Sequence, residues 1–576
     1  MKLAAIALDY DGTIAVDGVL DPGVREAIGA ARQQGIAVVL ATGRRLADLQ
    51  RAAGDLGCFD VVVAENGAVL TFPAGGRHVT FGHPPARDFL NELRRRGVDF
   101  TAGETLIETD AGSASVTLEV LRQLQLPLVL MFNRSRLMVL PQAISKSTGL
   151  RQALLALRLS IHNTIGIGDA ENDHDLLDAC EVGVAVAWGS GALRAVADEV
   201  IEGTGPPAVA AYVRRILRQP RLSAAQMGRR HMLLGRQHNG DPVSLAIRGR
   251  TVLIAGEPGT GKSYLAGLLC EQLILQGYGM CIIDPEGDYR SLDALPGVIT
   301  IGGEDPPPSA RELVRALRHP DVSVIVDLSR MAHHLRTEYL RTLLPMLVTL
   351  RRNTGLPHKI LVDEAHYCLG AGSAALLDPE LAGYILVTYR VSALDPSIRM
   401  TSDAVVMVTR ETDPFESEAL LHMCRPAPCP NLGPHVFSDL GPNEAALLPG
   451  VEEAHGEVRR FQMGPRLTSH VRHRAKYLDM PVLDDQAFVF TDRGRPGPRA
   501  HTLKQLMGLL AALPAEQILA HLARHDFSRW LEEVFRDHAL GERVRTLETQ
   551  GGAANARDTA ADIAQAIRAR YETAAT

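Results

Sequence analysis

Two aspartates stand two residues apart in the segment LDYDGT, at the end of the apolar run LAAIAL. A carboxylate that attacks phosphorus divides the hydrolysis of a phosphate ester into two easier steps. A second carboxylate close by can protonate the leaving oxygen and then activate the water of the second step. We therefore expect Asp9 to form an aspartyl-phosphate and Asp11 to be its general acid and base.

Four more polar residues complete this candidate site, namely Thr42 in ATGR, Lys146 in ISKSTGL, and Asp169 and Asp173 in GDAENDHDLL. The Thr42 hydroxyl can hydrogen-bond a phosphoryl oxygen, and Lys146 can neutralise the developing charge while Asp173 orients it. Carboxylates that face a phosphate need a cation between them, and carboxylate oxygens suit Mg²⁺. The predicted Mg²⁺ ligands are Asp9, Asp11, Asp169 and Asp173.

Strand-like and helix-like segments alternate through the first 218 residues, beginning with LAAIAL, GVREAIGAARQQG and IAVVLATGR. This alternation is typical of a parallel, doubly wound α/β sheet. In such sheets the functional site lies at the carboxyl ends of the strands. Because Asp9, Thr42 and Asp169 each follow a strand-like run, we expect them to converge.

The order of these motifs, together with ENGA at 65–68, resembles the haloacid dehalogenase (HAD) superfamily. Within it the resemblance is to the Cof-type phosphatases of subfamily IIB, which include sucrose-phosphatase-like enzymes. It implies a HAD Rossmann-like phosphatase domain over residues 1–218 with a small α+β cap at about 76–140. In this family the cap closes over the active site and sets specificity, so we expect a phosphorylated small-molecule substrate such as a sugar or nucleotide phosphate.

A second phosphate-binding pattern follows the apolar run TVLIA at 251–255. The segment GEPGTGKSY then opens a helix-like stretch, which is the strand–loop–helix context of a P-loop. Backbone N–H groups of such a loop surround the phosphates of ATP, the lysine reaches the β- and γ-phosphates, and the serine holds Mg²⁺. The predicted ATP-binding residues are Gly256, Glu257, Pro258, Gly259, Thr260, Gly261, Lys262, Ser263 and Tyr264.

Two acids at strand ends compete for the role of the metal-associated Walker B aspartate, Asp327 in VSVIVDLS and Asp363 in ILVDEAH. Only Asp363 has an adjacent glutamate that can polarise the attacking water. We therefore assign Asp363 to the metal and Glu364 to catalysis, and interpret Asp327 as a structural residue. Thr388 and Arg390, at the end of GYILVTYR, are candidates for sensing the γ-phosphate.

Residues 232–465 resemble the HerA/FtsK branch of P-loop motor ATPases through LLGR, GEPGTGKSYLAGLL, IIDPEGDY, ILVDEAH and the segment 387–410. The resemblance implies a RecA-like ATPase domain in which Asp284 belongs to the site. It also implies a homo-oligomer, with a hexameric ring favoured, that acts on double-stranded DNA. An arginine from a neighbouring copy would complete the ATP site, and the candidates are Arg250, Arg390, Arg399 and Arg410.

The rest of the chain is assigned to a linker at 219–231 and to a basic linker and helical C-terminal domain at 466–576. The run RRFQMGPRLTSHVRHRAK at 459–476 is interpreted as a solvated linker, with a phosphate-contacting strip as the alternative. We expect His521 to pack beside Trp530 rather than to bind a metal. The last helix should dock through an apolar stripe of Ala560, Ile563, Ile567 and Tyr571.

A possible zinc set near residues 422–435 has none of the standard spacings, so we expect no zinc there. Its members would be His422, Cys424, Cys429 and His435.

The composition limits the partners and the compartment. The net charge of −7 over 576 residues gives no overall attraction to nucleic acid, so DNA binding would need a local basic patch. Seven scattered cysteines indicate a reducing interior, and no apolar run is long enough to span a membrane. We therefore expect a soluble, cytoplasmic protein.

Two accounts of function remain open. In the first, the chain is a bifunctional hydrolase, a Mg²⁺-dependent phosphatase joined to an ATPase motor that acts on nucleic acid. In the second, an ATP-binding ring gates or assembles a small-molecule phosphatase, and nucleic acid has no part in it. The HerA-like motifs favour the first account, which we prefer, and the acidic net charge favours the second.

Overall fold

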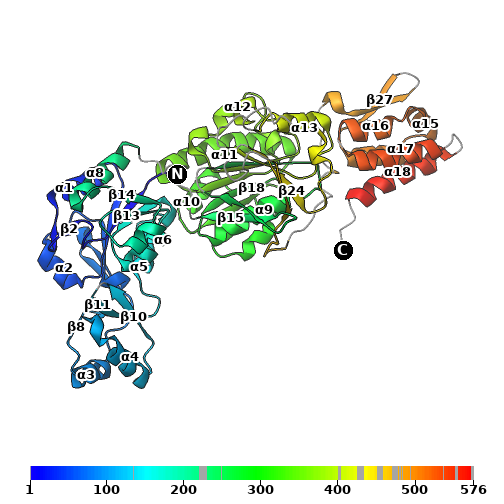
Figure 1. The fold of residues 1–576 in the computed structure, drawn as a ribbon. Helices are drawn as coiled ribbons and strands as arrows, with labels where there is room; N and C mark the ends of the chain where they lie inside the picture. Colours follow the sequence, from blue (N-terminus) through cyan, green and yellow to red (C-terminus); the bar gives the residue numbers. More distant parts are fainter. Residues whose placement is uncertain are drawn as a thin grey trace.

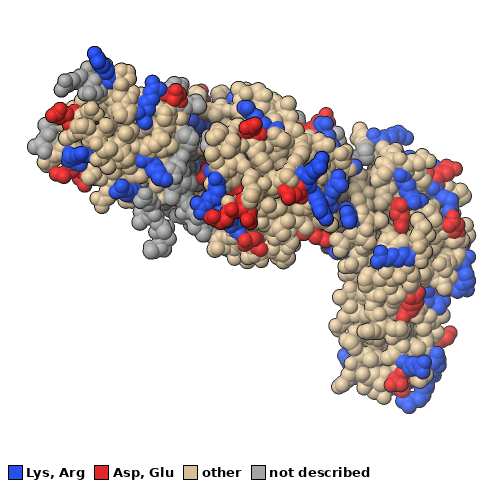
Figure 2. All heavy atoms as spheres, turned by 180° about the vertical axis from the view of Figure 1, so that it is seen from behind, with Lys and Arg blue, Asp and Glu red and all other residues tan. Residues whose placement is uncertain are grey.

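The computed structural model describes residues 2–133, 135–219, 230–247, 250–399, 404–424, 434–449, 458–469, 478, 482, 484–492, 495–535, 537–551 and 555–571. These residues form three domains in chain order, coloured blue to cyan, green to yellow and orange to red in Figure 1. The N-terminal domain bends away from the line of the other two, so the molecule is L-shaped in Figures 1 and 2.

An eight-stranded sheet forms the centre of the N-terminal domain. Its first six strands in spatial order are parallel, and the last two are antiparallel to their neighbours. Its strands are β14 (Glu199–Ile201), β13 (Val182–Val186), β12 (Thr164–Gly168), β1 (Ala5–Leu8), β4 (Ala37–Ala41), β5 (Val61–Ala64), β6 (Val69–Phe72) and β7 (Arg77–Thr80). Strands β1 and β12 are buried along their whole length, as expected for inner strands covered on both faces.

Helices cover both faces of this sheet. On one face α1 (Pro22–Gln33) packs with α8 (Gly205–Arg218), and α1 starts where the Asp21 carboxylate accepts from Val24 N–H. On the other face α5 (Lys146–Ala156) starts with a capping box. The smaller elements are α2 (Leu46–Ala53), α6 (His174–Ala179), α7 (Gly191–Val196) and the hairpin β2 (Ala15–Val16) and β3 (Val19–Leu20).

A small cap is inserted between β7 and α5. Its four-stranded antiparallel sheet packs against two helices. Its elements are β8 (Phe100–Ala102), β9 (Ile107–Asp110), β10 (Leu128–Asn133), β11 (Arg136–Pro141), α3 (Arg87–Arg95) and α4 (Ala114–Gln123). The cap is predicted at about 76–140; in the structure β7 continues the core sheet to Thr80, and the elements of the cap follow it.

The central domain is built on an eleven-stranded sheet. Seven neighbouring strands are parallel and four at one edge are antiparallel to their neighbours. The spatial order is β16 (Pro242–Ala246), β15 (His231–Arg236), β25 (Arg459–Met463), β24 (Glu444–Leu447), β23 (Ala404–Val408), β17 (Thr251–Ala255), β22 (Tyr384–Thr388), β21 (Lys359–Val362), β18 (Met280–Asp284), β20 (Ser323–Asp327) and β19 (Val298–Gly302).

The helices of the central domain are α9 (Lys262–Leu275), α10 (Ala310–Leu317), α11 (His333–Thr354), α12 (Pro396–Arg399) and α13 (Pro414–Leu421). Strand β25 closes the sheet against β15, so a segment more than 200 residues from the start of the domain completes it.

The C-terminal domain consists of a hairpin and five helices around one apolar core, in line with the predicted helical domain. The elements are β26 (Phe488–Asp492), β27 (Arg495–Ala500), α14 (Leu503–Ala512), α15 (Ala515–Ala523), α16 (Asp526–Glu533), α17 (His538–Gln550) and α18 (Ala556–Tyr571). The predicted stripe on α18 is buried against this same domain. None of the described helices is long and apolar enough to cross a membrane.

The N-terminal and central domains meet at the amino ends of their strands. His162, before β12, stacks on Tyr278, before β18, with ring centroids 3.8 Å apart. The Tyr278 hydroxyl donates to Glu181, before β13, at 2.9 Å, and Gln276 O lies 2.8 Å from His162 Nε2. Lys2 Nζ donates to Asn353 O. Functional sites in such sheets lie at the opposite, carboxyl ends, so both candidate sites lie away from this junction.

Candidate active sites

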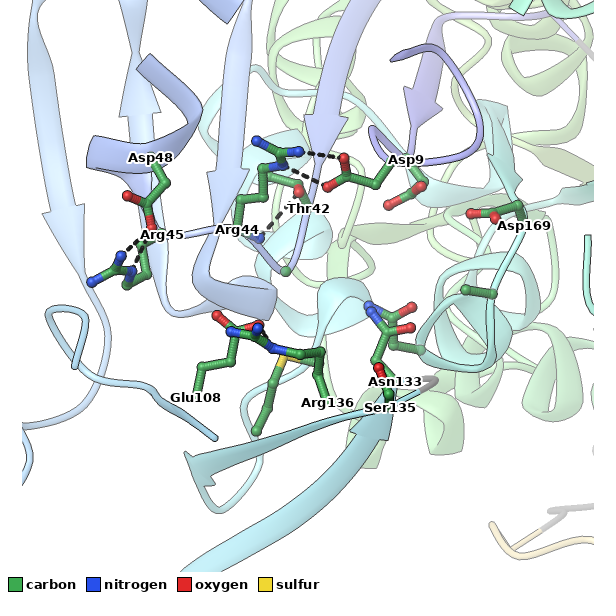
Figure 3. A pocket seen from close by; sticks show the side chains of 15 residues that line it. Asp9, Thr42, Arg44, Arg45, Asp48, Glu108, Asn133, Ser135, Arg136 and Asp169 are labelled. Atoms are coloured by element: carbon green, nitrogen blue, oxygen red, sulfur yellow. Dashed lines mark hydrogen bonds and ion pairs between the residues drawn. The ribbon is translucent and has the colours of Figure 1, made fainter. Parts of the chain in front are cut away.

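The first candidate site lies between the N-terminal sheet and the cap. A pocket of about 390 Å³ separates the strand ends from the cap hairpin, and Figure 3 shows side chains from both walls pointing into it. The labelled core residues include Asp9, Thr42 and Asp169, and the cap contributes Glu108 and Arg136. The cap hairpin also contributes Asn133, Ser135 and Met138.

A buried lysine holds the predicted catalytic carboxylates together. Lys146 Nζ lies 2.6 Å from Asp9 Oδ1 and 2.6 Å from Asp173 Oδ1, and all three side chains are buried. The other Asp173 oxygen accepts from Asp169 N–H and Ala170 N–H, at 3.0 and 3.1 Å. Burial opposes the charge on Lys146, but the two carboxylates outweigh it and raise the pKa of Lys146.

The same carboxylates form the one acidic group among the described residues that could hold a metal ion. Ligand oxygens of Asp9, Asp169 and Asp173 lie within 4.8 Å of one another. Burial, with the charges of Asp173 and Asp169, raises the pKa of Asp9 well above its ordinary value. Three carboxylates against one ammonium leave an excess of negative charge that a divalent cation would balance, so these residues fit Mg²⁺.

Asp11 is oriented differently from this cluster. Its carboxylate makes a two-pronged ion pair with Arg44, with Nε–Oδ2 and Nη2–Oδ1 both at 2.6 Å. Thr42 Oγ1 in turn accepts from Arg44 N–H at 3.1 Å. The structure therefore brings Asp9, Asp169 and Asp173 together, whereas the place of Asp11 among the metal ligands stays a prediction.

A glutamate that the motif search did not single out fastens the cap to the core. Glu65, directly after β5, has φ = 49° and is buried. Its carboxylate accepts from Glu104 N–H at 2.8 Å, Thr105 N–H at 3.0 Å and Leu106 N–H at 3.2 Å. ENGA was noted only as part of the family resemblance, and nothing in its spacing shows that the cap loop supplies the three donors.

The second candidate site follows β17 in the central sheet. Gly256 has φ = 137°, and a Cβ there would clash with the Thr409 hydroxyl, so the loop needs glycine. Gly261, at φ = 110°, ends the loop before α9. Lys262 Nζ donates to Glu257 O at 2.8 Å, so the lysine ammonium group lies against the loop that would surround the phosphates. The loop therefore has the backbone form expected of a P-loop.

Strand order supports the choice of Asp363 over Asp327. Asp363 and Glu364 follow β21, which is separated from the P-loop strand β17 only by β22. Asp327 ends β20, two strands farther away, and pairs there with Arg290. Asp363 and Glu364 are both buried, and Glu364 has φ = 47°.

A histidine next to these acids was missed as a candidate. His366 Nδ1 lies 3.0 Å from Thr388 Oγ1 and 3.6 Å from Glu364 Oε2. It therefore links the predicted catalytic glutamate to the predicted sensor threonine. The sequence ILVDEAH contains it, but its partner Thr388 lies on a different strand.

Asp284 and Arg390 make contacts within this chain. The Asp284 carboxylate accepts from four backbone N–H groups of the turn 286–289, at 2.7 to 3.2 Å. Arg390 donates to Val534 O of the C-terminal domain at 2.9 Å. Their roles at the nucleotide stay predictions.

Part of the basic run 459–476 is built into the fold. The Arg466 side chain is 1% exposed, and its Nε lies 2.9 Å from Glu271 Oε1. Arg460 donates to Val436 O at 2.7 Å. Arg460 lies on β25, an internal strand of the sheet, and the Arg466 side chain is buried against Glu271, so neither the linker nor the phosphate-strip interpretation holds for these two residues. Residues 470–477 lie outside the described residues.

The structure describes the surroundings of His521, but only part of the possible zinc set near residues 422–435. His521 Nδ1 lies 2.7 Å from Asp526, and its Nε2 accepts from Thr491 N–H at 3.0 Å. His521 is therefore a packed, hydrogen-bonded residue, and Trp530 is likewise buried in the same core. Cys429 lies outside the described residues, as does the side chain of His435.

Comparisons with known proteins match both domains. Residues 6–102 and 88–213 match the model of the haloacid dehalogenase-like hydrolases, and residues 236–346 match that of the central domain of helicase HerA. The chain therefore joins a HAD-like hydrolase domain to a HerA-type domain, and the expected HAD Rossmann-like and P-loop folds are confirmed.

Individual relatives cover the N-terminal domain. A phosphoglycolate phosphatase of Methanosarcina acetivorans is 29% identical over 231 aligned positions, and the match covers 35% of this chain and 92% of that protein. One from Methanothermobacter thermautotrophicus is 26% identical over 37% of this chain and 99% of that protein. A HAD-like hydrolase structure from Bacteroides thetaiotaomicron is 19% identical, covers 37% of this chain and 100% of that one, and has a TM-score of 0.33.

Proposed function

We propose that this protein is a Mg²⁺-dependent bifunctional phosphohydrolase, in which a HAD-type phosphatase is joined to an ATPase that acts on nucleic acid. The observation that carries the phosphatase half is the buried ion triad, in which Lys146 bridges Asp9 and Asp173 at 2.6 Å each beneath the cap pocket. Burying the charged Lys146 between two carboxylates costs desolvation free energy. Charged groups buried at this cost are concentrated at functional sites, which supports a catalytic role for the Lys146 charge.

The chain's own residues account for the steps of hydrolysis. Asp9 attacks phosphorus and forms the aspartyl-phosphate, while Lys146 neutralises charge on the phosphoryl oxygens. Asp11 gives its proton to the leaving oxygen and then takes one from the attacking water. For this, Asp11 must part from Arg44, whose guanidinium is then free to meet the substrate phosphate. Mg²⁺, held by Asp9 and Asp169, would supply charge neutralisation between carboxylates and phosphate.

We infer a small, polar leaving group for this phosphatase. The cap wall of the pocket offers Asn133, Ser135 and the ion pair between Glu108 and Arg136, at 2.8 Å. These groups suit hydroxyl or carboxylate substituents rather than an apolar one. Because the relatives are named phosphoglycolate phosphatases, 2-phosphoglycolate is the first substrate to test, beside sugar and nucleotide monophosphates.

The test is phosphate release from these esters by the purified full chain, with Mg²⁺ and after its removal by a chelator. The proposal expects turnover of at least one ester that disappears with the chelator and returns with added Mg²⁺. Equal turnover in both conditions, or none on any ester, would contradict it.

For the central domain we propose ATP binding by the loop 256–263 and hydrolysis that depends on Asp363 and Glu364. The glycine-dependent loop, the buried acids two strands along and the match to the HerA central domain support this. We further propose a homo-oligomeric ring in which an arginine of another copy completes the site. Steady-state ATP hydrolysis with and without duplex DNA tests the nucleic-acid part, since stimulation that fades as salt rises marks phosphate contacts.

The second account, a phosphatase gated by ATP, is favoured by one observation. The two domains share a buried junction in which His162, Glu181 and Tyr278 are each at most 2% exposed. A buried, hydrogen-bonded junction can transmit a change in the central sheet to the N-terminal one. ATP that alters ester turnover in the absence of any DNA effect would favour this account.

A further inference from the structure

A cleft outside both catalytic sites lies where the N-terminal and central domains meet. It has a volume of about 460 Å³ and lies against α10, α11 and Arg158, which comes two residues after the end of α5. Four arginines line it, and no acidic residue does. The lining residues are Arg158, Ala310, Arg311, Val314, Arg315, Arg318, His319 and Met346.

The arginines of this cleft are exposed and have no carboxylate partner among the described residues. Arg311, Arg315 and Arg318 stand at i, i+4 and i+7 of the α10 segment, so they lie along one side of it over about 10 Å. Arg158 comes from the N-terminal domain and faces the same cleft. In Figure 2 a group of Lys and Arg side chains lies where these two domains meet, in the region in which Figure 1 places α10.

The small free energy of a single exposed ion pair determines which kind of anion can bind to this surface. A single exposed pair is worth about 0–1 kcal/mol, so one phosphate group would gain little here. A polyanion meets several arginines at once and releases its counterions, which makes the contributions add. Over about 10 Å a DNA duplex presents roughly six phosphates, enough to engage the whole row.

We propose that this arginine cleft binds the phosphodiester backbone of nucleic acid. The proposal rests on the proposed action on nucleic acid and names a surface for it outside the ATP site. The uncharged floor of Val314 and Met346 leaves room for the sugars between the phosphates. Helix α5 carries Lys146 of the phosphatase site in its first turn and ends two residues before Arg158, so the cleft adjoins both domains.

The experiment measures binding of a fluorescein-labelled 30-base-pair duplex to the full chain by anisotropy, over a series of salt concentrations. Replacing Arg311 and Arg315 together by Gln should weaken binding roughly tenfold at low salt and lower the slope of log Kd against log salt by about two. The control replaces Arg87 and Arg122, exposed arginines of the cap, by Gln and should bind as the unchanged protein does.

Three other outcomes would each contradict the proposed cleft, the proposed action on nucleic acid, or both. If the unchanged protein binds duplex but the Arg311→Gln/Arg315→Gln variant binds equally well, the cleft is not the site, and action on nucleic acid stands. If the unchanged protein binds no duplex at any salt, both proposals fail. If polyglutamate at equal charge displaces the duplex from the cleft as well as unlabelled DNA does, the surface serves an acidic protein partner instead.

Discussion

His162 of the N-terminal domain and Tyr278 of the central domain stack with their ring centroids 3.8 Å apart and their planes 17° from parallel. Both residues precede strands, whereas Asp9, Thr42 and Glu364 of the candidate sites follow strands. The two domains are thus joined at the amino ends of their strands, and both candidate sites lie away from this junction. The junction is a direct contact through which a change in one domain can reach the other.

The junction predicts that the two domains unfold together. Replacing Tyr278 by Ala removes both the stack and the hydrogen bond to Glu181, which would leave a buried carboxylate short of a donor and cost about 1–3 kcal/mol. Calorimetry should show one shared transition for the two domains in the unchanged protein and separate transitions in the variant. Tyr212→Ala, at a buried tyrosine inside the N-terminal domain, is the control and should lower the transition without splitting it.

The hydrogen bonds between the Glu65 carboxylate and the cap loop predict that a change at Glu65 lowers phosphatase activity alone. A hydrogen bond to a charged acceptor such as the Glu65 carboxylate contributes about 1.5–3 kcal/mol. Glu65→Gln removes this charge and places an amide NH₂ opposite backbone N–H donors, so these hydrogen bonds are weakened or lost. We expect kcat/KM for the ester to fall at least about tenfold, since 1.4 kcal/mol corresponds to tenfold in rate, while ATP turnover stays unchanged. Glu104→Gln, at a half-exposed glutamate of the same loop, should change neither.

Lys359 predicts a dependence of stability on pH. Burial, with the nearby Arg351 charge, lowers the pKa of Lys359 to about 7, although its Nζ donates to Ile247 O at 2.6 Å. The unfolded chain keeps an ordinary lysine, so between about pH 7 and 10 it binds more protons than the folded one, and stability rises with pH. The thermal midpoint should therefore rise from pH 7 to pH 9 relative to that of Lys359→Met. Parallel curves for the two proteins would exclude this role.

The sequence predicted the features that depend on a strand and the few residues after it. Asp9 and Asp169 follow buried parallel strands of one sheet and the P-loop follows one of another, so the carboxyl edge of each sheet could be inferred without knowing the strand order. The assignment of Asp363 rather than Asp327 to the metal rests on the adjacent glutamate and stays a prediction.

Features made by distant segments could not be predicted. Glu65 meets its three donors about 40 residues later, through the placement of the cap. The charge of Arg466 predicts a solvated residue of a basic linker, because the sequence does not show the partner that buries it. That partner, Glu271, lies 195 residues away on α9. The same holds for the link from His366 to Thr388, which crosses from β21 to β22.

The central claim is that one chain holds two separate phosphate-hydrolysing sites, and reciprocal variants test it most directly. Phosphate-ester turnover and ATP turnover are measured on the full chain carrying Asp9→Asn or Glu364→Gln, with folding checked by calorimetry. The account predicts that Asp9→Asn abolishes ester hydrolysis and leaves ATP hydrolysis intact, and that Glu364→Gln does the reverse. Loss of both activities from either single change in a folded protein would contradict it.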